Sequence, residues 1–319
     1  MHFSVSGVDV SPIIPPLVAF VISSLTASAG VSGAFLLLPF QVSVLGFGGP
    51  AVSPTNLLYN IIAIPGGVYR YIKEGRMVWP IAAVTMIGTA PGLFVGAVIR
   101  IKYLPDPRSF KVFIGAVLLY LGVRLLYELT DRSRRSKAAQ QDQDRRFQEK
   151  LKACSFGEGR ACLPADAVVR AKRIDAKRVE YEFWGETYGF NPIALMAVSL
   201  VVGLVGGVYG IGGGAIIAPV LVSIMGLPIY TVAGAALFGT FATSVLGVGY
   251  FELLSLTPLA SGQPVRPDWA LGALFGVGGL AGTYVGARIQ KFLPDRLIRL
   301  VLGLIVTGLS LSYIVQYFL

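Results

Sequence analysis

The sequence predicts an all-α polytopic membrane protein with two inverted-topology repeats of about five hydrophobic helical segments each. Three observations lead to this fold class. The chain of 319 residues is 54% hydrophobic and only 14% charged, a composition unusual for a soluble domain. Apolar stretches recur at about the 17–25 residues that a bilayer crossing needs. The two halves of the chain also align with each other, at a constant spacing of 180 residues as far as residues 67 and 247 and at about 190 residues further on.

This internal repeat is clearest at two glycine-rich breaks. Residues 28–39 align with residues 208–219, and each stretch runs from small residues through apolar residues to a proline. Later segments carry glycine at every fourth position, namely Gly88, Gly92 and Gly96, and Gly278, Gly282 and Gly286. Glycines on one helix face let neighbouring backbones approach closely. We expect these glycines to serve helix packing and not to contact a substrate.

The apolar segments group into two transmembrane repeats, which we expect at residues 12–129 and 191–319, with a charged insert at 130–190. The predicted segments of the first repeat are 12–28, 32–46, 51–72, 78–101 and 108–129. Those of the second repeat are 192–208, 212–226, 229–254, 267–290 and 295–317. The first two segments of each repeat are short, and the sequence leaves open whether they cross the membrane or form a re-entrant hairpin. Alternation at 179–184 predicts short strands in the insert.

The distribution of Lys and Arg predicts the orientation, because these residues are enriched in cytoplasmic loops. The insert and the loops at 70–76 and 288–299 are rich in both residues, so we expect them to be cytoplasmic. Both termini then lie outside, and the two halves have opposite topology. One loop disagrees, because the basic residues between 100 and 111 would also lie outside.

Residues that carry enzyme or metal chemistry are scarce. His2 is the only histidine, and the only two cysteines, Cys154 and Cys162, fall in the insert. We therefore expect no enzyme activity and no metal or other cofactor, and no dense basic stripe predicts nucleic-acid binding. No Asp, Glu or His lies in the middle of an apolar segment, so a carboxylate proton relay is unsupported.

The two breaks form the candidate binding site. A broken helix exposes backbone N–H groups at the start of its second half, and these can bind an anion without a charged side chain. Asn56 and Asn60 share a helix face in the next segment, where they either donate to an oxyanion or tie neighbouring helices. Asn60 aligns with Thr240, whereas Thr243 and Ser244 are weaker candidates because such hydroxyls can bond their own helix. The predicted substrate-binding residues are Gly30, Ser32, Gly33, Asn56, Asn60, Gly212, Gly213, Gly214 and Thr240.

These motifs resemble the sulfite exporter TauE/SafE family. The resemblance is carried by Gly210-Ile211-Gly212-Gly213-Gly214 with Pro219, by Gly30-Val31-Ser32-Gly33 with Pro39, and by Thr55-Asn56. It covers nearly all of 12–129 and 191–317. The resemblance implies a multi-pass carrier of small sulfur-containing anions, such as sulfite, thiosulfate or sulfoacetate, in a prokaryotic inner membrane. The long insert and Ser32, in place of a middle glycine, depart from the family pattern, and Ser32 puts equal participation of the two halves in doubt.

Export is the expected direction of transport, and two other functions stay open from the sequence. The same fold could carry another small organic anion, such as a carboxylate. Alternatively, the chain is a membrane sensor or scaffold whose insert binds a soluble partner. The lipid bilayer surrounds the chain in all three cases.

Overall fold

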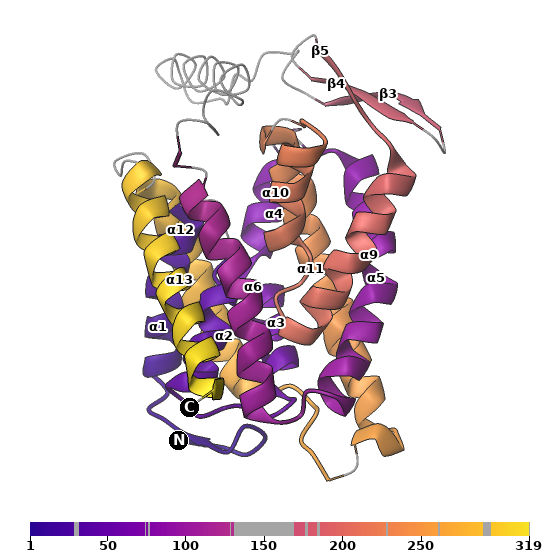
Figure 1. The fold of residues 1–319 in the computed structure, drawn as a ribbon. Helices are drawn as coiled ribbons and strands as arrows, with labels where there is room; N and C mark the ends of the chain where they lie inside the picture. Colours follow the sequence, from indigo (N-terminus) through magenta and orange to yellow (C-terminus); the bar gives the residue numbers. More distant parts are fainter. Residues whose placement is uncertain are drawn as a thin grey trace.

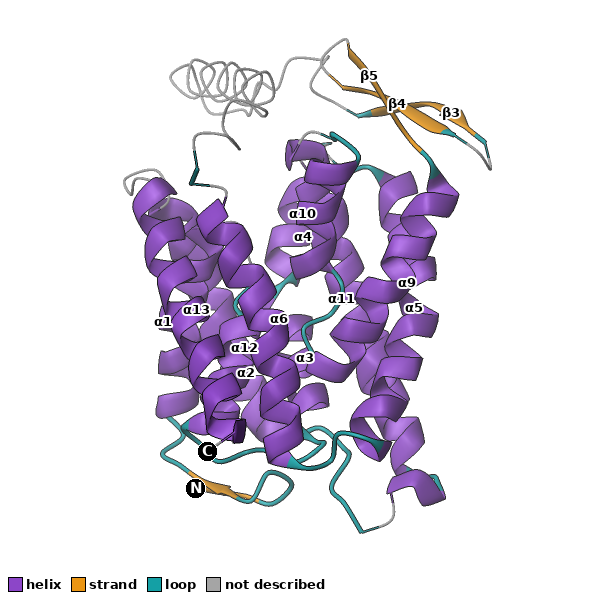
Figure 2. Cartoon of the chain, viewed as in Figure 1, coloured by secondary structure: helices purple, strands orange, loops and turns teal. Residues whose placement is uncertain are grey.

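The computed structural model is a bundle of helices with a small sheet at one end (Figures 1 and 2). It describes residues 1–28, 32–73, 75, 77–127, 129–130, 169–175, 178–183, 186–227, 229–260, 262–289 and 295–318. In this part of the chain, six helices contain a span long and apolar enough to cross a membrane: α5 (Trp79–Lys102), α6 (Pro107–Tyr127), α9 (Pro192–Tyr209), α11 (Ile229–Ser255), α12 (Trp269–Ile289) and α13 (Asp295–Phe318). The prediction of an all-α polytopic membrane protein is confirmed.

Shorter elements complete the described part of the chain. They are β1 (His2–Phe3), β2 (Val8–Asp9), α1 (Ile14–Ser28), α2 (Ala34–Ser43), α3 (Val52–Ala63), α4 (Pro65–Lys73), α10 (Gly214–Ile224) and the 3₁₀ turn η2 (Pro258–Ala260). The predicted segment 51–72 is thus two helices, α3 and α4, that meet at Ile64. Pro65 has no N–H group to continue the hydrogen-bond ladder of α3, so the helix is interrupted there.

The short helix α2 runs back toward the end of the molecule where α1 starts, and α10 runs back toward the end where α9 (Pro192–Tyr209) starts (Figure 1). With 10 residues, α2 is about 15 Å long, which is half of the roughly 30 Å hydrocarbon core. Its end lies near the C-terminal end of α13, because the Ser43 hydroxyl hydrogen-bonds to that of Tyr313. In Figure 1, α1 begins and α2 ends at the end of the molecule that carries both termini, and α9 and α10 do the same at the opposite end. Each pair therefore forms a helical hairpin whose two outer ends lie at one end of the molecule (Figure 1).

Helices of one half pack on helices of the other in a reciprocal pattern. α1 packs on α12 and α9 on α5, while α3 packs on α12 and α11 on α5. α6 and α13, the last helices of the two halves, pack on each other. α1 also starts at the end opposite to the start of α9 (Figure 1). These relations are those expected of inverted repeats, which stay a prediction.

The glycine rows lie in these helix contacts. A Cβ at Gly92 or Gly96 of α5 would collide with backbone carbonyls of α9, at Leu200 and Leu204. Gly282 of α12 would collide in the same way with the carbonyl of Phe20 in α1. The interpretation of these rows as close helix packing is confirmed.

The described part of the insert forms an antiparallel sheet of β3 (Arg170–Ile174), β4 (Val179–Phe183) and β5 (Glu186–Phe190). The strand predicted at 179–184 corresponds to β4, whose alternate residues Val179, Tyr181 and Phe183 are buried. The Tyr181 hydroxyl hydrogen-bonds to that of Thr231 near the start of α11 at 2.9 Å. The sheet is therefore docked on the helix bundle. Cys154 and Cys162 lie outside the described residues.

Candidate functional site

The two breaks meet at Asn56, a fully buried residue in the middle of α3. Its Nδ2 donates to the backbone carbonyl of Ala34 at 3.0 Å and to that of Gly210 at 2.9 Å. Its Oδ1 accepts from Nε2 of Gln41 in α2 at 3.2 Å. One side chain thus joins the start of α2 to the end of α9.

Asn60 repeats this connection one helical turn further along α3. Its Nδ2 donates to the carbonyl of Ile211 at 3.0 Å, and its Oδ1 accepts from the Ser32 hydroxyl at 3.3 Å. Two interpretations of these asparagines stay open from the sequence, donation to an anion and the tying of helices. In this structure both hydrogens of the Asn56 amide are donated to backbone carbonyls of the two breaks. The Asn60 amide donates one of its two hydrogens, to the carbonyl of Ile211.

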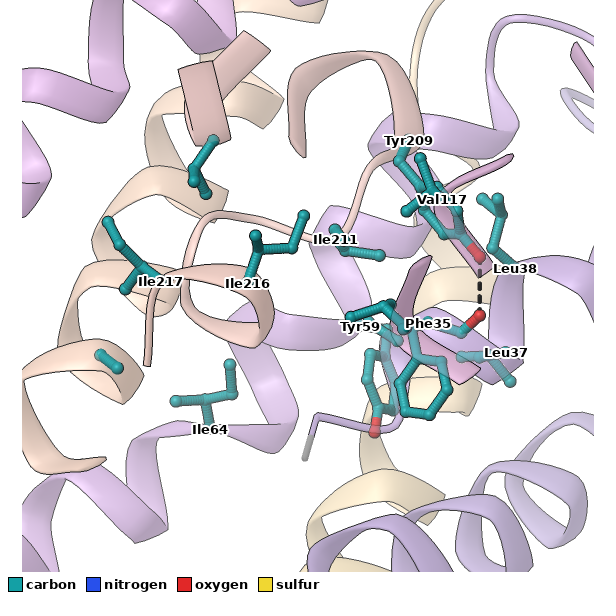
Figure 3. Packing of buried hydrophobic residues seen from close by; sticks show 14 of the residues in the cluster. Phe35, Leu37, Leu38, Tyr59, Ile64, Val117, Tyr209, Ile211, Ile216 and Ile217 are labelled. Atoms are coloured by element: carbon teal, nitrogen blue, oxygen red, sulfur yellow. Dashed lines mark hydrogen bonds between the residues drawn. The ribbon is translucent and has the colours of Figure 1, made fainter. Parts of the chain in front are cut away.

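Two further polar contacts that the sequence analysis missed hold the breaks together. The buried Tyr209 hydroxyl at the end of α9 donates to the carbonyl of Phe35 in α2 at 2.8 Å, the dashed line in Figure 3. The Ser53 hydroxyl of α3 donates to the carbonyl of Val208 at 2.9 Å. Gln41 was missed as well, although a lone amide in an apolar run is a signal that it needs a buried partner.

The second break turns through two glycines in the left-handed conformation. Gly210 has φ +83° and Gly212 has φ +67°, which side chains rarely adopt. A Cβ at Gly210 would lie 2.7 Å from the Cα of Ser53. A Cβ at Gly212 would lie 2.9 Å from Cγ2 of Thr240 and 3.1 Å from Oγ of Ser244. Glycine is required at both positions by backbone conformation and by space.

The helices that follow the breaks begin after glycines, although at α2 the N–H of Ala34 donates to the Ser32 hydroxyl at 3.4 Å. α2 begins after Gly33 and α10 after Gly213, and neither residue provides a side chain to bond the first N–H groups. The first N–H groups of a helix have no partner within the helix, and the helix dipole makes this end positive. Such ends suit an anionic ligand.

The hydroxyl groups around the second break differ in what they can still donate. Thr240 and Thr243 donate to carbonyls of their own helix, at Ala236 (2.9 Å) and Gly239 (2.6 Å). Ser244 is also fully buried, but its Oγ has no hydrogen-bond partner in the described part of the chain. The hydroxyl of the predicted site residue Thr240 is therefore occupied, and that of the weaker candidate Ser244 is not.

Eight of the nine predicted site residues lie in the described part of the chain, and they gather at this meeting of the breaks. Gly30 lies outside the described residues. Ser32 and Gly33 precede α2, Asn56 and Asn60 lie on α3, and Thr240 lies on α11 beside Gly212. Gly213 and Gly214 form the start of α10. Sequence reasoning also did not associate Thr89 of α5 with the breaks, although its Cγ2 would lie 3.1 Å from a Cβ at Gly213.

A buried arginine lies near the C-terminal end of α5. The fully buried Arg100 donates from its guanidinium to the carbonyls of Leu104, Gly48 (3.0 Å) and Gly49 (2.8 Å). The guanidinium also stacks on the ring of Phe110 at 3.6 Å. Arg100 belongs to the basic loop that disagreed with the predicted orientation. Because its charge is held inside the protein by local carbonyls, it is a weak indicator of orientation.

Comparison with known proteins identifies a family whose model covers both breaks. A protein-family model described as sulfite exporter TauE/SafE matches residues 16–313. This match includes both breaks and every helix from α2 to α12. No curated protein and no solved structure matches the chain.

Proposed function

The chain belongs to the sulfite exporter TauE/SafE family, and from this premise we propose that it exports a small sulfur-containing anion such as sulfite, thiosulfate or sulfoacetate. It is a multi-pass membrane transporter of anions and not an enzyme. We propose that the anion binds where the two breaks meet, and that the membrane is a prokaryotic inner membrane.

The observation that carries this proposal is the pair of helix starts that follow the two breaks, at α2 and α10, with the breaks themselves joined through Asn56. An anion in the middle of a bilayer needs hydrogen-bond donors, and isolated charged side chains are costly there. The helix starts provide donors from the backbone at no such cost. Broken helices at matching positions of two halves are where carriers bind their substrates.

Two inverted repeats are part of the same proposal. The reciprocal packing of α1 on α12 and of α9 on α5 supports them, as do the opposite starting ends of α1 and α9. Such a pair can expose one central site to either side of the membrane by rocking one half against the other. The repeats would span 12–129 and 191–319, separated by the insert at 130–190.

The proposed orientation has the face with β3–β5 in the cytoplasm and both termini outside. It rests on the Lys and Arg residues of the insert and of the neighbouring loops. An anion that leaves a cell with an inside-negative potential gains about 2.3 kcal/mol per unit charge and 100 mV. Export therefore proceeds without a carboxylate relay in the spans.

A ligand screen on the purified protein tests the proposed substrate class. Sulfite, thiosulfate, sulfoacetate, sulfate, acetate and succinate are each titrated while thermal unfolding is followed. A ligand that binds the folded protein raises its stability by mass action, by about 2.7 kcal/mol at one hundred times its Kd. We expect sulfur oxyanions to stabilise the protein and the carboxylates to have no effect. Stabilisation by carboxylates alone would replace the proposal with an organic-anion carrier.

A further inference from the structure

We propose that the second break alone forms the anion subsite, that the Ser244 hydroxyl is its side-chain donor, and that it takes one singly charged head group such as bisulfite or a sulfonate. This inference rests on the proposed function and narrows it. The two breaks look equivalent in sequence, so the structure decides between them.

The unpartnered Ser244 hydroxyl is the first reason. A buried hydroxyl without a hydrogen bond costs about 1–3 kcal/mol, and Ser244 is fully buried on α11. Its Oγ lies 3.1 Å from the position of a Cβ at Gly212, immediately before the uncapped start of α10. The hydroxyl therefore lies beside a positive helix end that also lacks a side-chain partner. A bound oxyanion would satisfy both groups.

Other buried hydroxyls without partners lie in different surroundings. In the described part of the chain these are Ser199, whose Cβ packs against Gly88, and Thr307, which packs against Gly122. Both lie in contacts between long helices and not at a helix start. Of these three described hydroxyls, that of Ser244 is the one that lies at the positive end of a helix.

Among the described residues, the first break has no equivalent hydroxyl. A Cβ at Gly33 would lie 2.5 Å from the Tyr59 hydroxyl and 3.0 Å from that of Ser23, and these two hydroxyls bond each other at 2.7 Å. The third hydroxyl there, on Thr26, bonds the carbonyl of Ile22 in its own helix. The Ser32 hydroxyl is used by Asn60. The space in front of the first break is thus filled by groups that already have partners.

The charge of the site sets the charge of its ligand. A helix N-terminus is equivalent to about half a positive charge. The described lysines and arginines lie near helix ends or in connecting segments, and Arg100 is bound to carbonyls. Half a charge and one hydroxyl compensate a monoanion better than a dianion such as sulfate in a medium of low dielectric constant. The methyl group of Thr240 lies beside Gly212, 2.9 Å from the position of a Cβ there.

Ser244→Ala tests the donor directly. We measure the affinity of the full-length protein for sulfite and for methanesulfonate by titration in detergent. The variant is expected to bind both about tenfold more weakly or worse, because a hydrogen bond to a charged group is lost. Its melting temperature without ligand should equal or exceed that of the wild type, because a buried hydroxyl without a partner has been removed. A structural role of Ser244 would lower that melting temperature instead.

Two matched variants serve as controls. Thr243→Val removes the neighbouring buried hydroxyl, and Tyr59→Phe removes the hydroxyl in front of the first break. Both should bind the anions with unchanged affinity. Methanesulfonate, a permanent monoanion, should bind equally at pH 6 and pH 8, whereas sulfite should bind more tightly at pH 6, where more of it is bisulfite.

The outcomes separate this inference from the proposed function. If the wild type binds sulfur oxyanions and Ser244→Ala binds them equally well, the subsite is wrong and the proposed function stands. The same holds if Tyr59→Phe weakens binding and Ser244→Ala does not. If no sulfur oxyanion binds the wild type, the proposed function fails and this inference with it.

Discussion

The first and second breaks share a sequence pattern but need their glycines for different reasons. Gly33, at the first break, has φ −63°, an ordinary helical value, and is glycine because the hydroxyls of Tyr59 and Ser23 occupy the space of a side chain. Gly210 and Gly212, at the second break, have left-handed backbone conformations. At the described positions, side chains fill the space beside Gly33, whereas the backbone conformation requires glycine at Gly210 and Gly212.

This difference shows that a repeated sequence need not repeat a function. Asn60 of the first half aligns with Thr240 of the second, yet Asn60 joins the two breaks while Thr240 bonds its own helix. The departure of Ser32 from the family pattern has the same consequence, because its hydroxyl is bonded to Asn60. Asn56 and Asn60 of the first half join the two breaks, and in the second half the Ser244 hydroxyl is left without a partner in the described part of the chain.

The largest expected effect is that of Gly210→Ala. The left-handed backbone costs an alanine about 1–2 kcal/mol, and its Cβ would press on the backbone of Ser53, which adds roughly 1–3 kcal/mol of overpacking. We expect a large loss of thermal stability, measured on the purified protein by differential scanning fluorimetry.

Gly226→Ala is the matched control for this change. Gly226 has φ +67°, and a Cβ there would have no heavy atom within 4 Å among those compared. It should lose only the roughly 1–2 kcal/mol of backbone strain. Equal losses at both positions would show that the second break is not held tightly against α3.

Asn56→Ala should have the next largest effect. It leaves the carbonyls of Ala34 and Gly210 and the amide of Gln41 without their partner, at a cost of about 1–3 kcal/mol for a buried polar group left unpaired. Asn60→Ala removes fewer hydrogen bonds, to Ile211 and Ser32, and should destabilise less. Chemical denaturation of both variants measures this order.

The reverse order would contradict the account of how the breaks are joined. Asn56→Ala with normal stability and no transport would instead indicate that this amide donates to the anion. Both variants are therefore also tested for sulfite flux in liposomes.

The smallest expected effect at neutral pH concerns the docked sheet, which should respond only to alkaline pH. Burial raises the pKa of Tyr181 to about 12, opposed by its hydrogen bond to Thr231. Because the folded pKa lies above the unfolded value, the stability from this group is complete below pH 10 and is lost as the pH rises to 12. We expect the wild type to lose up to roughly 3 kcal/mol more over this range than Tyr181→Phe. Parallel pH profiles of the two proteins would mean that β4 is not docked on α11.

Much of the fold follows from the sequence because length and composition determine which segments can cross a bilayer. The predicted segments 78–101 and 192–208 match α5 (Trp79–Lys102) and α9 (Pro192–Tyr209) closely. The split at Pro65 could have been predicted from its missing N–H. The reversal of direction at α2 and α10 could not have been predicted, because a short apolar segment has the same composition whether it crosses the bilayer or turns back.

The candidate site was only partly predictable. The glycines identified the breaks and the asparagines identified α3. Glycine destabilises a helix interior, and a buried amide is unfavourable unless it is hydrogen-bonded, so both residue types indicate a specific role. The bonds that decide their roles join residues far apart in the chain, such as Asn56 and Gly210. Whether a hydroxyl is free, as on Ser244, or bound to its own helix, as on Thr243, depends on side-chain rotation, which no pattern reveals.

Sulfite flux through liposomes that contain the purified protein tests the central claim most directly. The account predicts saturable flux, which methanesulfonate inhibits and acetate does not, and which is strongly reduced in Ser244→Ala at low sulfite concentration. Flux no faster than in protein-free liposomes, from a protein shown to be folded, would contradict the claim that this chain carries a sulfur oxyanion.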